Sequence, residues 1–405
     1  MSNSCLNANG MMTSKQKQQD HYHQPNLSHD LEKQQQLIRY KWPSLLCPDV
    51  TNPTLSWIIG SRFVVPAVGL FSKFWMNVVN KSTVYNANIF YETLNRNYLA
   101  LFSSHKSITR RPLITYCNHT SCMDDPLIWG SLMPFNWLLN SNRLRWTSAA
   151  AEICFNSPIY TTFFALGKTF PMIRGEGIYQ PAMNYASRLM RNGNWIHFFP
   201  EGKVVPRPEN ADPRLVNFNL DEYNGDSAQL VNTTSSDNQY SLKWGMARLI
   251  IEHVLSEGKD NDNEYCQIKP NQCSSMQDLP PEHLESNRPN KTLPEVDVLP
   301  MYHFGMDDVL PTKKPYIPRI SCRVTFLVRP EGPIRIDRNF LTKLFSQDDE
   351  NQLTKSSSSS SSSSIDLSLT EKRIRLMKFL EKELNILAAK TRALHFHHEN
   401  HEQGE

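Results

Sequence analysis

The sequence lacks any strong excess of charge of one sign. Its 43 lysines and arginines are balanced by 40 aspartates and glutamates, and the net charge of +3 over 405 residues excludes binding of nucleic acid by bulk electrostatic attraction. The eight cysteines include no Cys-x-x-Cys pair, so neither a zinc ribbon nor a disulfide framework is expected, and the thiols are expected to be reduced. Neither a cleavable secretory signal nor a cleavable, Arg-rich mitochondrial presequence is predicted at the start of the sequence.

Polar, low-complexity stretches divide the chain. Residues 1–38 are rich in Gln, Asn, Ser, His and Lys and contain too few large apolar groups to offset the entropy of ordering them, so a disordered tail is predicted. Residues 39–345 are long enough for one sizeable core, and polar insertions at about 205–240 and 257–295 interrupt them. The ordered part is therefore predicted to be a single domain.

The C-terminal part begins with a serine run, and residues 346–367 are predicted to be a flexible linker. Ser368 and Glu371 then form a capping-box pattern, which predicts a helix at the start of residues 368–405, followed by a His-rich tail. The leucine and methionine side chains of this helix fall on one seam, so we expect it to dock on the domain, with pairing to a partner as the alternative.

The most apolar stretch is residues 55–79. Arg62 and Lys73 bracket an apolar centre that is shorter than the roughly 20 residues of a spanning helix and that contains a proline. We predict a segment that dips into one leaflet, with Trp57 and Trp75 at headgroup depth and the two cations snorkelling. A buried core helix is the alternative.

A candidate catalytic pair follows the strand predicted at residues 113–116. His119 and Asp124 lie in the turn between this strand and a helix for which Asp125 is a good N-cap and Pro126 a good first residue. A tight bend can bring the imidazole and the carboxylate into hydrogen-bond reach. A neutral His can then take a proton from a hydroxyl while the carboxylate fixes its tautomer. The alternative is an ordinary turn with a capping Asp.

A second polar turn follows a helix predicted over residues 180–191 and a buried strand over 195–199. A helix that leads into a buried strand after an earlier strand is the crossover pattern of an α/β sheet. The turn Pro200-Glu201-Gly202 ends this strand, at the sheet edge where open α/β sheets bind ligands. Further strands are predicted over residues 296–304 and 323–328.

These motifs resemble those of the glycerolipid acyltransferase family. The string from Asn118 to Asp124 resembles the first motif of the family, and Phe199-Pro200-Glu201-Gly202 matches the third without departure. The run ending in Pro300 resembles the fourth. The resemblance covers most of residues 40–345 outside the insertions. It implies a mixed sheet flanked by helices, with monotopic membrane-inserting segments, to which the apolar patch at 163–166 would belong.

The strand predicted over residues 168–173 ends in Arg174, which corresponds to the second motif of the family. The resemblance implies that Arg174 holds the phosphate of the acyl acceptor, because a planar guanidinium can bind a phosphate through two hydrogen bonds. The alternative is a surface arginine in a turn before Gly175.

The resemblance also implies a mechanism. His119 would deprotonate the free hydroxyl of a lysophospholipid, Asp124 would orient His119, and no cofactor or metal would be needed. The substrate-binding residues implied by the motifs are Asn118, Ser121, Arg174, Phe199, Pro200, Glu201 and Gly202.

Phrases around Lys41, Met123, Lys203, Trp244 and Gly305 resemble the phospholipid–lysophospholipid transacylase branch of the family. This branch implies CoA-independent remodelling of monolysocardiolipin to cardiolipin, with phosphatidylcholine as an acyl donor. It also implies monotopic attachment to the inner and outer mitochondrial membranes facing the intermembrane space, no nucleic-acid partner, and possible homo-oligomers or larger membrane complexes.

Four other functions stay open. A CoA-dependent lysophospholipid or glycerol-3-phosphate acyltransferase would use the same base with a thioester donor. An acyl-enzyme variant would use Ser121 or Cys122 as the nucleophile. A non-catalytic membrane-organising protein would not need His119. A metal-dependent hydrolase would use His119, Asp124 and His303, although no ligand pattern supports it.

Overall fold

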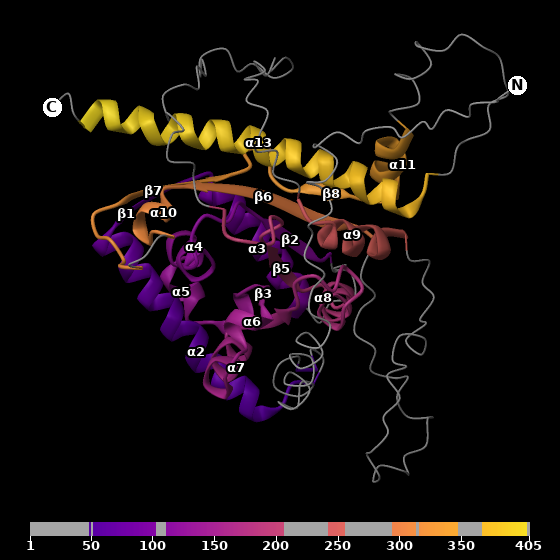
Figure 1. The fold of residues 1–405 in the computed structure, drawn as a ribbon, viewed down its shortest axis with the longest axis horizontal. Coiled ribbons are helices and arrows are strands. Elements are labelled where there is room, and N and C mark those ends of the chain that lie inside the picture. Colours follow the sequence, from indigo (N-terminus) through magenta and orange to yellow (C-terminus); the bar gives the residue numbers. More distant parts are fainter. Residues whose placement is uncertain are drawn as a thin grey trace, which may run out of the picture.

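The computed structural model describes residues 48–49, 52–102, 111–205, 242–255, 294–312, 316–346 and 367–402. The predicted N-terminal tail lies outside the described residues, and so do the serine linker and the two insertions apart from residues at their ends. The division of the chain into these segments stays a prediction. The described chain forms a mixed sheet flanked by helices (Figure 1), which confirms the predicted fold class.

Within the described residues, the strands form one sheet in the order β1-β7-β6-β2-β5-β3-β4, and β8 pairs with β6. The strands are β1 (Lys81–Tyr85), β2 (Leu113–Tyr116), β3 (Trp146–Ala150), β4 (Thr169–Met172), β5 (Trp195–Phe198), β6 (Val296–Phe304), β7 (Arg323–Val328) and β8 (Ile334–Ile336). The strands predicted from the sequence correspond to β2, β4, β5, β6 and β7.

The middle of the sheet is parallel. β2 pairs in parallel with β5 on one side and with β6 on the other, and β5 continues in parallel to β3 and β4. The second half of β6 pairs antiparallel with β7, which carries the parallel edge strand β1. The carboxyl ends of β5, β2 and β6 therefore meet at one edge of the sheet.

The helical elements are α2 (Leu55–Phe74), the π-helical turn η1 (Trp75–Val79), α3 (Ala87–Phe102), α4 (Asp124–Leu132), α5 (Phe135–Leu138), the 3-10 turn η2 (Ser141–Arg143), α6 (Ala151–Cys154), α7 (Pro158–Leu166), α8 (Pro181–Arg191), α9 (Gly245–Leu255), α10 (Met306–Val309), α11 (Arg338–Ser346) and α13 (Leu369–Glu402). The helix predicted over 180–191 is α8.

Alternate residues of β2 point to opposite faces of the sheet. Ile114 and Tyr116 pack in a core with residues of α8, α9 and α13. Leu113 and Cys117 pack in a second core with residues of α2, α3 and α4. Period-two alternation thus places one apolar cluster on each face, and the helices form an outer layer on both sides.

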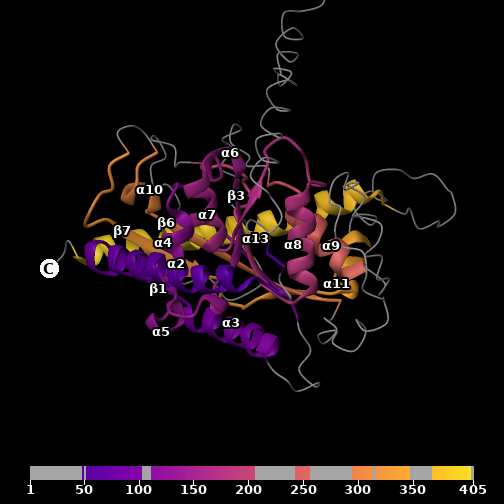
Figure 2. The ribbon, with the colours of Figure 1, turned by 90° about the horizontal axis from the view of Figure 1, so that it is seen from below.

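The helix α13 lies along the face of the sheet opposite to α2 (Figures 1 and 2). It starts as predicted, with Ser368 Oγ accepting the backbone N–H of Glu371 at 3.2 Å. The phenol of Tyr116 donates to the carbonyl oxygen of Leu380 at 2.8 Å, and Arg329 donates to Glu383 at 2.9 Å. The buried apolar seam of α13 consists of Leu376, Met377, Leu380, Leu384 and Leu387.

One face of α2 packs against the domain, chiefly on α4, α5 and α7. Small side chains allow the close approach. A methyl group added to Gly130 of α4 would lie 2.4 Å from the backbone carbonyl carbon of Ser72. The other face of α2 is exposed and apolar, and its residues include Leu55, Ile59, Phe63, Phe71 and Phe74, followed by the exposed Val78 of η1.

Two details of the predicted membrane segment are wrong. Trp57 is not at the surface. It is buried, stacks on Trp146 with 5.6 Å between ring centroids, and donates its indole N–H to the carbonyl of Ala165 at 3.2 Å. Lys73 does not snorkel, because its Nζ donates to the carbonyl of Met133 at 2.9 Å. Both side chains lie on the packed face of the helix, which the sequence did not identify.

The contact between α2 and α4 generates a stability prediction. Gly130→Ala is expected to destabilise the fold by about 1–3 kcal/mol, because the added methyl group meets backbone that cannot move aside cheaply. Thermal unfolding measures the effect. The matched control is Gly245→Ala, whose methyl group meets only the flexible end of Met183 at 3.2 Å. Equal melting temperatures for the two variants would contradict the prediction.

Candidate active site

Two turns and the second half of β6 meet at the carboxyl edge of the sheet. The turn after β2 carries His119, the turn after β5 carries Glu201, and β6 places His303 beside them. The first two turns are joined by hydrogen bonds: the backbone N–H of His119 donates to Glu201 Oε2 at 3.1 Å, and the carbonyl of His119 accepts the N–H of Val205 at 2.7 Å. The crossover topology thus places the first and third predicted motifs together.

His119 and Asp124 form the expected pair. His119 Nδ1 lies 2.9 Å from Asp124 Oδ2. The Asp124 side chain is fully buried, whereas 19% of the His119 side chain is exposed. The same Oδ2 accepts the backbone N–H groups of Thr120 at 2.7 Å and Ser121 at 2.9 Å. These donors provide hydrogen bonds to the buried carboxylate.

This geometry fixes the protonation of the imidazole. An oxygen that accepts two backbone N–H groups is an acceptor toward His119 as well, so His119 Nδ1 carries the proton. Nε2 of His119 is then the basic nitrogen. Phe199 stacks on the face of the His119 ring, with 4.3 Å between the ring centroids. The pair can accept a proton at Nε2 and stabilise the resulting imidazolium.

Hydrogen bonds of Asn118 connect the turn after β2 to β6. Its side-chain amide donates to the carbonyl of His303 and accepts the backbone N–H of His303, each at 3.0 Å. In return, His303 Nε2 lies 2.9 Å from the carbonyl of Asn118. The residue predicted to bind substrate is therefore 98% buried and engaged with the protein, and its observed contacts position the backbone of His119.

Ser121 is fully buried. Its hydroxyl donates to the carbonyl of Leu310 at 3.3 Å and accepts the N–H of Met123 at 3.4 Å. The hydroxyl hydrogen thus points to a backbone oxygen and away from His119. Because a serine nucleophile needs its hydroxyl hydrogen-bonded to the base, this geometry does not support the acyl-enzyme variant that uses Ser121.

Comparisons with known proteins show which sequences are similar to this chain. The model of a family described as Acyltransferase matches residues 95–271. Tafazzin from Drosophila melanogaster is 31% identical over 69% of this chain and 53% of its own length. The Dictyostelium discoideum protein named taffazin is 28% identical over 66% of this chain and 68% of its own length. Residues 95–271, which contain the site, form an acyltransferase domain, and the chain is similar to the tafazzins.

Two further comparisons concern shorter or more distant similarity. N-acylphosphatidylethanolamine synthase from Arabidopsis thaliana is 41% identical over 35% of this chain and 46% of its own length. The crystal structure of the 1-acyl-sn-glycerophosphate acyltransferase PlsC from Thermotoga maritima shows a TM-score of 0.37 at 13% identity, over 88% of this chain and 89% of that chain. The match spans about half the length of the Drosophila relative.

The second motif of the glycerolipid acyltransferases lies apart from the first. Arg174 follows β4 at the sheet edge, and its guanidinium pairs with Glu152 at 3.1 Å. β5 and β3 separate β4 from β2, which corresponds to roughly 14 Å across the sheet. Arg174 is half exposed and does not contact His119 within the described residues, so its role as a phosphate ligand stays a prediction.

The predicted N-cap role of Asp125 is wrong. Helix α4 begins at Asp124, and Asp125 instead pairs with the buried guanidinium of Arg145 and accepts the indole N–H of Trp129 at 3.1 Å. Burial lowers the pKa of Arg145 to about 9. Asp125 therefore compensates a buried cation, which a cap assignment from local sequence cannot detect.

Sequence reasoning also missed His197 on β5. It is fully buried beneath the site, with Nδ1 2.8 Å from the hydroxyl of Thr115 and the ring edge-to-face with Phe199 at 4.6 Å between centroids. Burial, reinforced by the charge of Arg145, lowers its pKa well below the usual value. A neutral His197 supports Phe199, which in turn stacks on His119.

Glu201 generates a pH prediction. Burial, partly opposed by the N–H of His119, raises the pKa of Glu201 to about 7. Between pH 4.5 and 7 the unfolded chain loses this proton before the folded chain does, so the group contributes less stability as the pH rises. Glu201→Gln keeps an acceptor for His119 and does not titrate. Its melting temperature should therefore rise relative to wild type from pH 5 to pH 8.

The control for this measurement is Glu331→Gln, because the Glu331 side chain is 48% exposed and is expected to show no such rise. Parallel melting curves for Glu201→Gln and wild type across this pH range would contradict the assignment of Glu201 as a carboxyl that binds its proton more tightly in the folded state.

Proposed function

We propose that this protein transfers an acyl chain from a phospholipid to a lysophospholipid without CoA, with His119 as the general base and Asp124 as the residue that orients it. The observation that carries the proposal is the 2.9 Å contact between His119 Nδ1 and Asp124 Oδ2 at the carboxyl edge of the sheet. The motif match and the relatives named tafazzin support it.

The reaction proceeds in two balanced steps. His119 Nε2 takes the proton of the acceptor hydroxyl, and the oxygen attacks the ester carbonyl of the donor to give a tetrahedral intermediate. The intermediate then expels the glycerol oxygen of the donor, which takes the proton back from the imidazolium. One ester is broken and one is formed, so no cofactor or energy input is required. We propose monolysocardiolipin as the acceptor and phosphatidylcholine as a donor.

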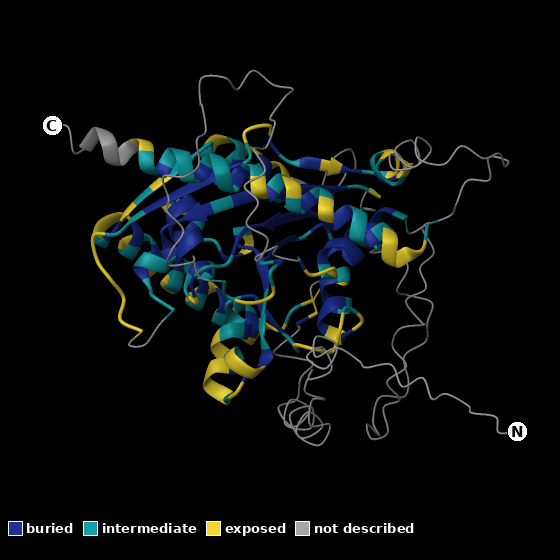
Figure 3. Cartoon of the chain, turned by 45° about the horizontal axis from the view of Figure 1, so that its top comes forward, coloured by how far each residue is buried: buried dark blue, intermediate teal, exposed yellow. Residues whose placement is uncertain are grey.

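Membrane attachment is part of the proposal. Among the described residues, the helix from Leu55 to Val79 is long and apolar enough to cross a membrane, with 28% of its most apolar window buried. The packed face of α2 and the hydrogen bonds of Lys73 hold the helix against α4, which favours a helix that lies in one leaflet over one that spans. The exposed residues Ile159, Tyr160 and Phe163 of α7 extend this face, and Figure 3 shows exposed residues over α7.

We propose the mitochondrial membranes that face the intermembrane space as the location, in line with the names of the relatives. The alternative of a metal-dependent hydrolase is not favoured by the geometry. His303 Nε2 donates to the carbonyl of Asn118, so this nitrogen is not available as a metal ligand. Among the described residues, no three His, Cys, Asp or Glu side chains are grouped as a metal site.

A second candidate acceptor is the amine of phosphatidylethanolamine. It is favoured by the 41% identity, over 143 residues, to N-acylphosphatidylethanolamine synthase. An amine attacks an ester through the same deprotonation by His119, and the product is an amide. Alkaline hydrolysis separates the two products, because an ester is cleaved under conditions that leave an amide intact.

The test uses purified protein and liposomes that contain phosphatidylcholine with a labelled acyl chain, monolysocardiolipin and phosphatidylethanolamine, without CoA. Wild type should place the label in cardiolipin. His119→Ala should lower the rate by about a hundredfold or more, because a general base contributes about 10²–10⁴. The matched control is His397→Ala, an exposed histidine of α13, which should retain the wild-type rate.

The outcomes distinguish the alternatives. Transfer only after acyl-CoA is added would indicate a CoA-dependent acyltransferase, and label in the amide would indicate the amine acceptor. Cys122→Ala should keep the activity, since Cys122 is exposed and has no role in direct transfer. Full activity of His119→Ala, or no transfer under any condition, would contradict the proposal and favour a non-catalytic membrane protein.

The apolar face of α2 generates a separate prediction. Phe63→Ser and Phe71→Ser replace side chains that are 80% and 55% exposed. Each should weaken binding to liposomes by about tenfold, because burying a Phe side chain contributes about 1.5–3 kcal/mol. Co-sedimentation measures the binding. The control is Leu369→Ser, which removes an exposed apolar side chain from α13 on the other side of the sheet. Equal losses in all three variants would contradict a membrane-facing α2.

A further inference from the structure

His303 has no task in the proposed reaction, yet it is 99% buried directly behind the catalytic pair. Its Nε2 lies 3.5 Å from Asp124 Oδ2, the oxygen that binds His119. Asp124 Oδ1, in contrast, is buried and has no hydrogen-bond partner within the described part of the chain. All the donors to the carboxylate of Asp124 are thus on Oδ2, and Oδ1 accepts no hydrogen bond from the described residues.

The tautomer of His303 follows from its contacts. Its Nε2 lies 2.9 Å from the carbonyl oxygen of Asn118, and a carbonyl can only accept, so Nε2 carries a proton. Nδ1 of His303 is buried and, among the described residues, makes no hydrogen bond. A second proton there would leave a buried donor unpaired, which is costly. The ring is therefore neutral, with its single N–H donated to the carbonyl of Asn118 and with Nε2 3.5 Å from Asp124 Oδ2.

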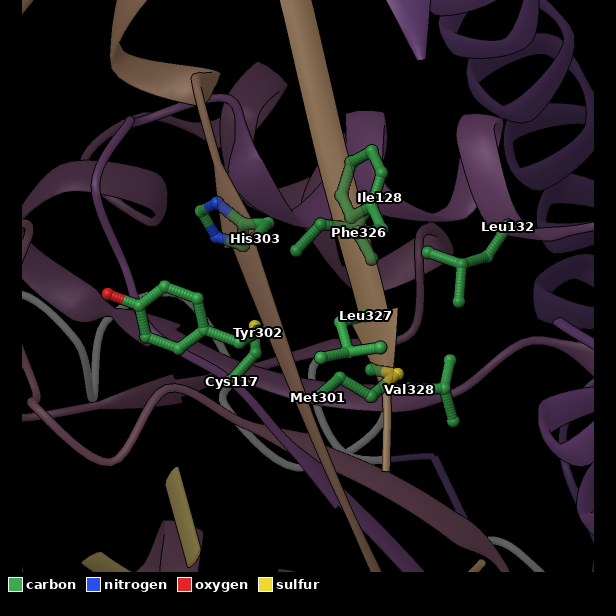
Figure 4. Close-up of a pocket in the computed structure, with 9 residues that line it drawn as sticks. All are labelled: Cys117, Ile128, Leu132, Met301, Tyr302, His303, Phe326, Leu327 and Val328. Carbon is green, nitrogen blue, oxygen red and sulfur yellow. The ribbon is translucent and has the colours of Figure 1, made fainter. Parts of the chain in front are cut away.

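The surroundings of the ring agree with a neutral state. His303 lines a small apolar pocket with Met301, Ile128 and Phe326, and Figure 4 shows its ring beside Phe326 of the neighbouring strand. Burial lowers the pKa of His303. The charged or titratable groups that act on it are Asp124 from α4, Asp307 from α10 and His119, and the two carboxylates oppose the shift without providing a partner for Nδ1.

We propose that His303 is a positioning residue for the catalytic pair: its Nε2–H fixes the carbonyl of Asn118 and holds Asp124 Oδ2 in the orientation that faces His119. Asn118 and His303 bind each other reciprocally, the amide of Asn118 to the backbone of His303 and the ring of His303 to the backbone of Asn118. This inference rests on the proposed base role of His119. It assigns His303 an electrostatic task beyond filling the core.

The task makes a directional prediction. The N–H dipole of His303 stabilises the negative charge of Asp124. Without it, Asp124 attracts the proton of His119 more strongly, and the pKa of His119 rises. The carboxylate also loses a constraint on its rotation toward the unpaired Oδ1. A merely structural role would lower the amount of folded protein and leave the pKa of His119 unchanged.

The experiment compares His303→Leu, which has no donor, with His303→Gln, whose side-chain N–H₂ can replace Nε2–H. In the liposome transfer assay, per folded molecule, His303→Leu should be slower by roughly ten- to a hundredfold, and the acid limb of its pH–rate profile should move to higher pH. His303→Gln should stay within a few fold of wild type, with an unmoved acid limb.

A second readout does not need activity. The pKa of His119 is measured by NMR titration of ring-labelled histidine in the full chain, with the resonance assigned through His119→Ala. It should rise in His303→Leu and stay at the wild-type value in His303→Gln. If wild type transfers no acyl chain, the proposed function fails, while this titration still decides the coupling between His303 and the pair.

Two results would overturn the inference. One is a wild-type rate and an unchanged His119 pKa in His303→Leu. The other is an equal loss of rate in His303→Leu and His303→Gln with an unchanged His119 pKa, which would indicate a packing role only. If His303→Leu does not fold, His303→Asn replaces it, because its amide ends one bond short of Nε2. Gln should then exceed Asn by about tenfold, and equal rates would overturn the inference.

Discussion

The buried carboxylate of Asp124 is the group on which the arrangement of the site depends. A charge without solvent must be compensated by donors, and here the donors are the backbone N–H groups of Thr120 and Ser121 and the ring of His119. These groups converge on one oxygen only when the chain bends sharply after β2. The chain therefore compensates the charge of Asp124 by forming the turn that brings His119 and Asp124 together.

The second constraint is the register between β2 and β6. Tyr116 is opposite Pro300 in the parallel pairing, which brings the turn after β2 alongside the second half of β6. The Asn118 side chain then completes two hydrogen bonds to His303 that resemble the next step of the strand pairing. The site is thus an extension of the sheet by side-chain hydrogen bonds.

Local patterns in the sequence were sufficient to predict most of the elements and the contact between His119 and Asp124. Apolar runs predicted β2, β5, β6 and β7, and the spacing from His119 to Asp124 fits a single turn. Tertiary contacts were not accessible in this way. The pairing of Asp125 with Arg145 and of Asn118 with His303 links residues that are 20 and 185 positions apart, and only the strand order brings each pair together.

The same limit explains the errors for residues 55–79. Tryptophan and lysine at the ends of an apolar helix are typical of a membrane interface, but Trp57 and Lys73 lie on the face that α4 and α7 cover. Helical periodicity shows that two faces exist, whereas the identity of the packed face depends on small residues in the partner helix, such as Gly130. That information lies about 60 residues further along the chain.

The strand order also affects how the chain folds during translation. β6 occupies the middle of the sheet, but it is translated about 200 residues after α2. At 5–20 residues per second, roughly 10–40 seconds pass between the two. During that interval the packed face of α2 meets α4, α5 and α7, which are translated well before β6, whereas β2 still lacks its partner on one side. A nascent chain of this topology therefore has one unpaired edge of β2 until β6 is translated, and such an edge can pair with another chain.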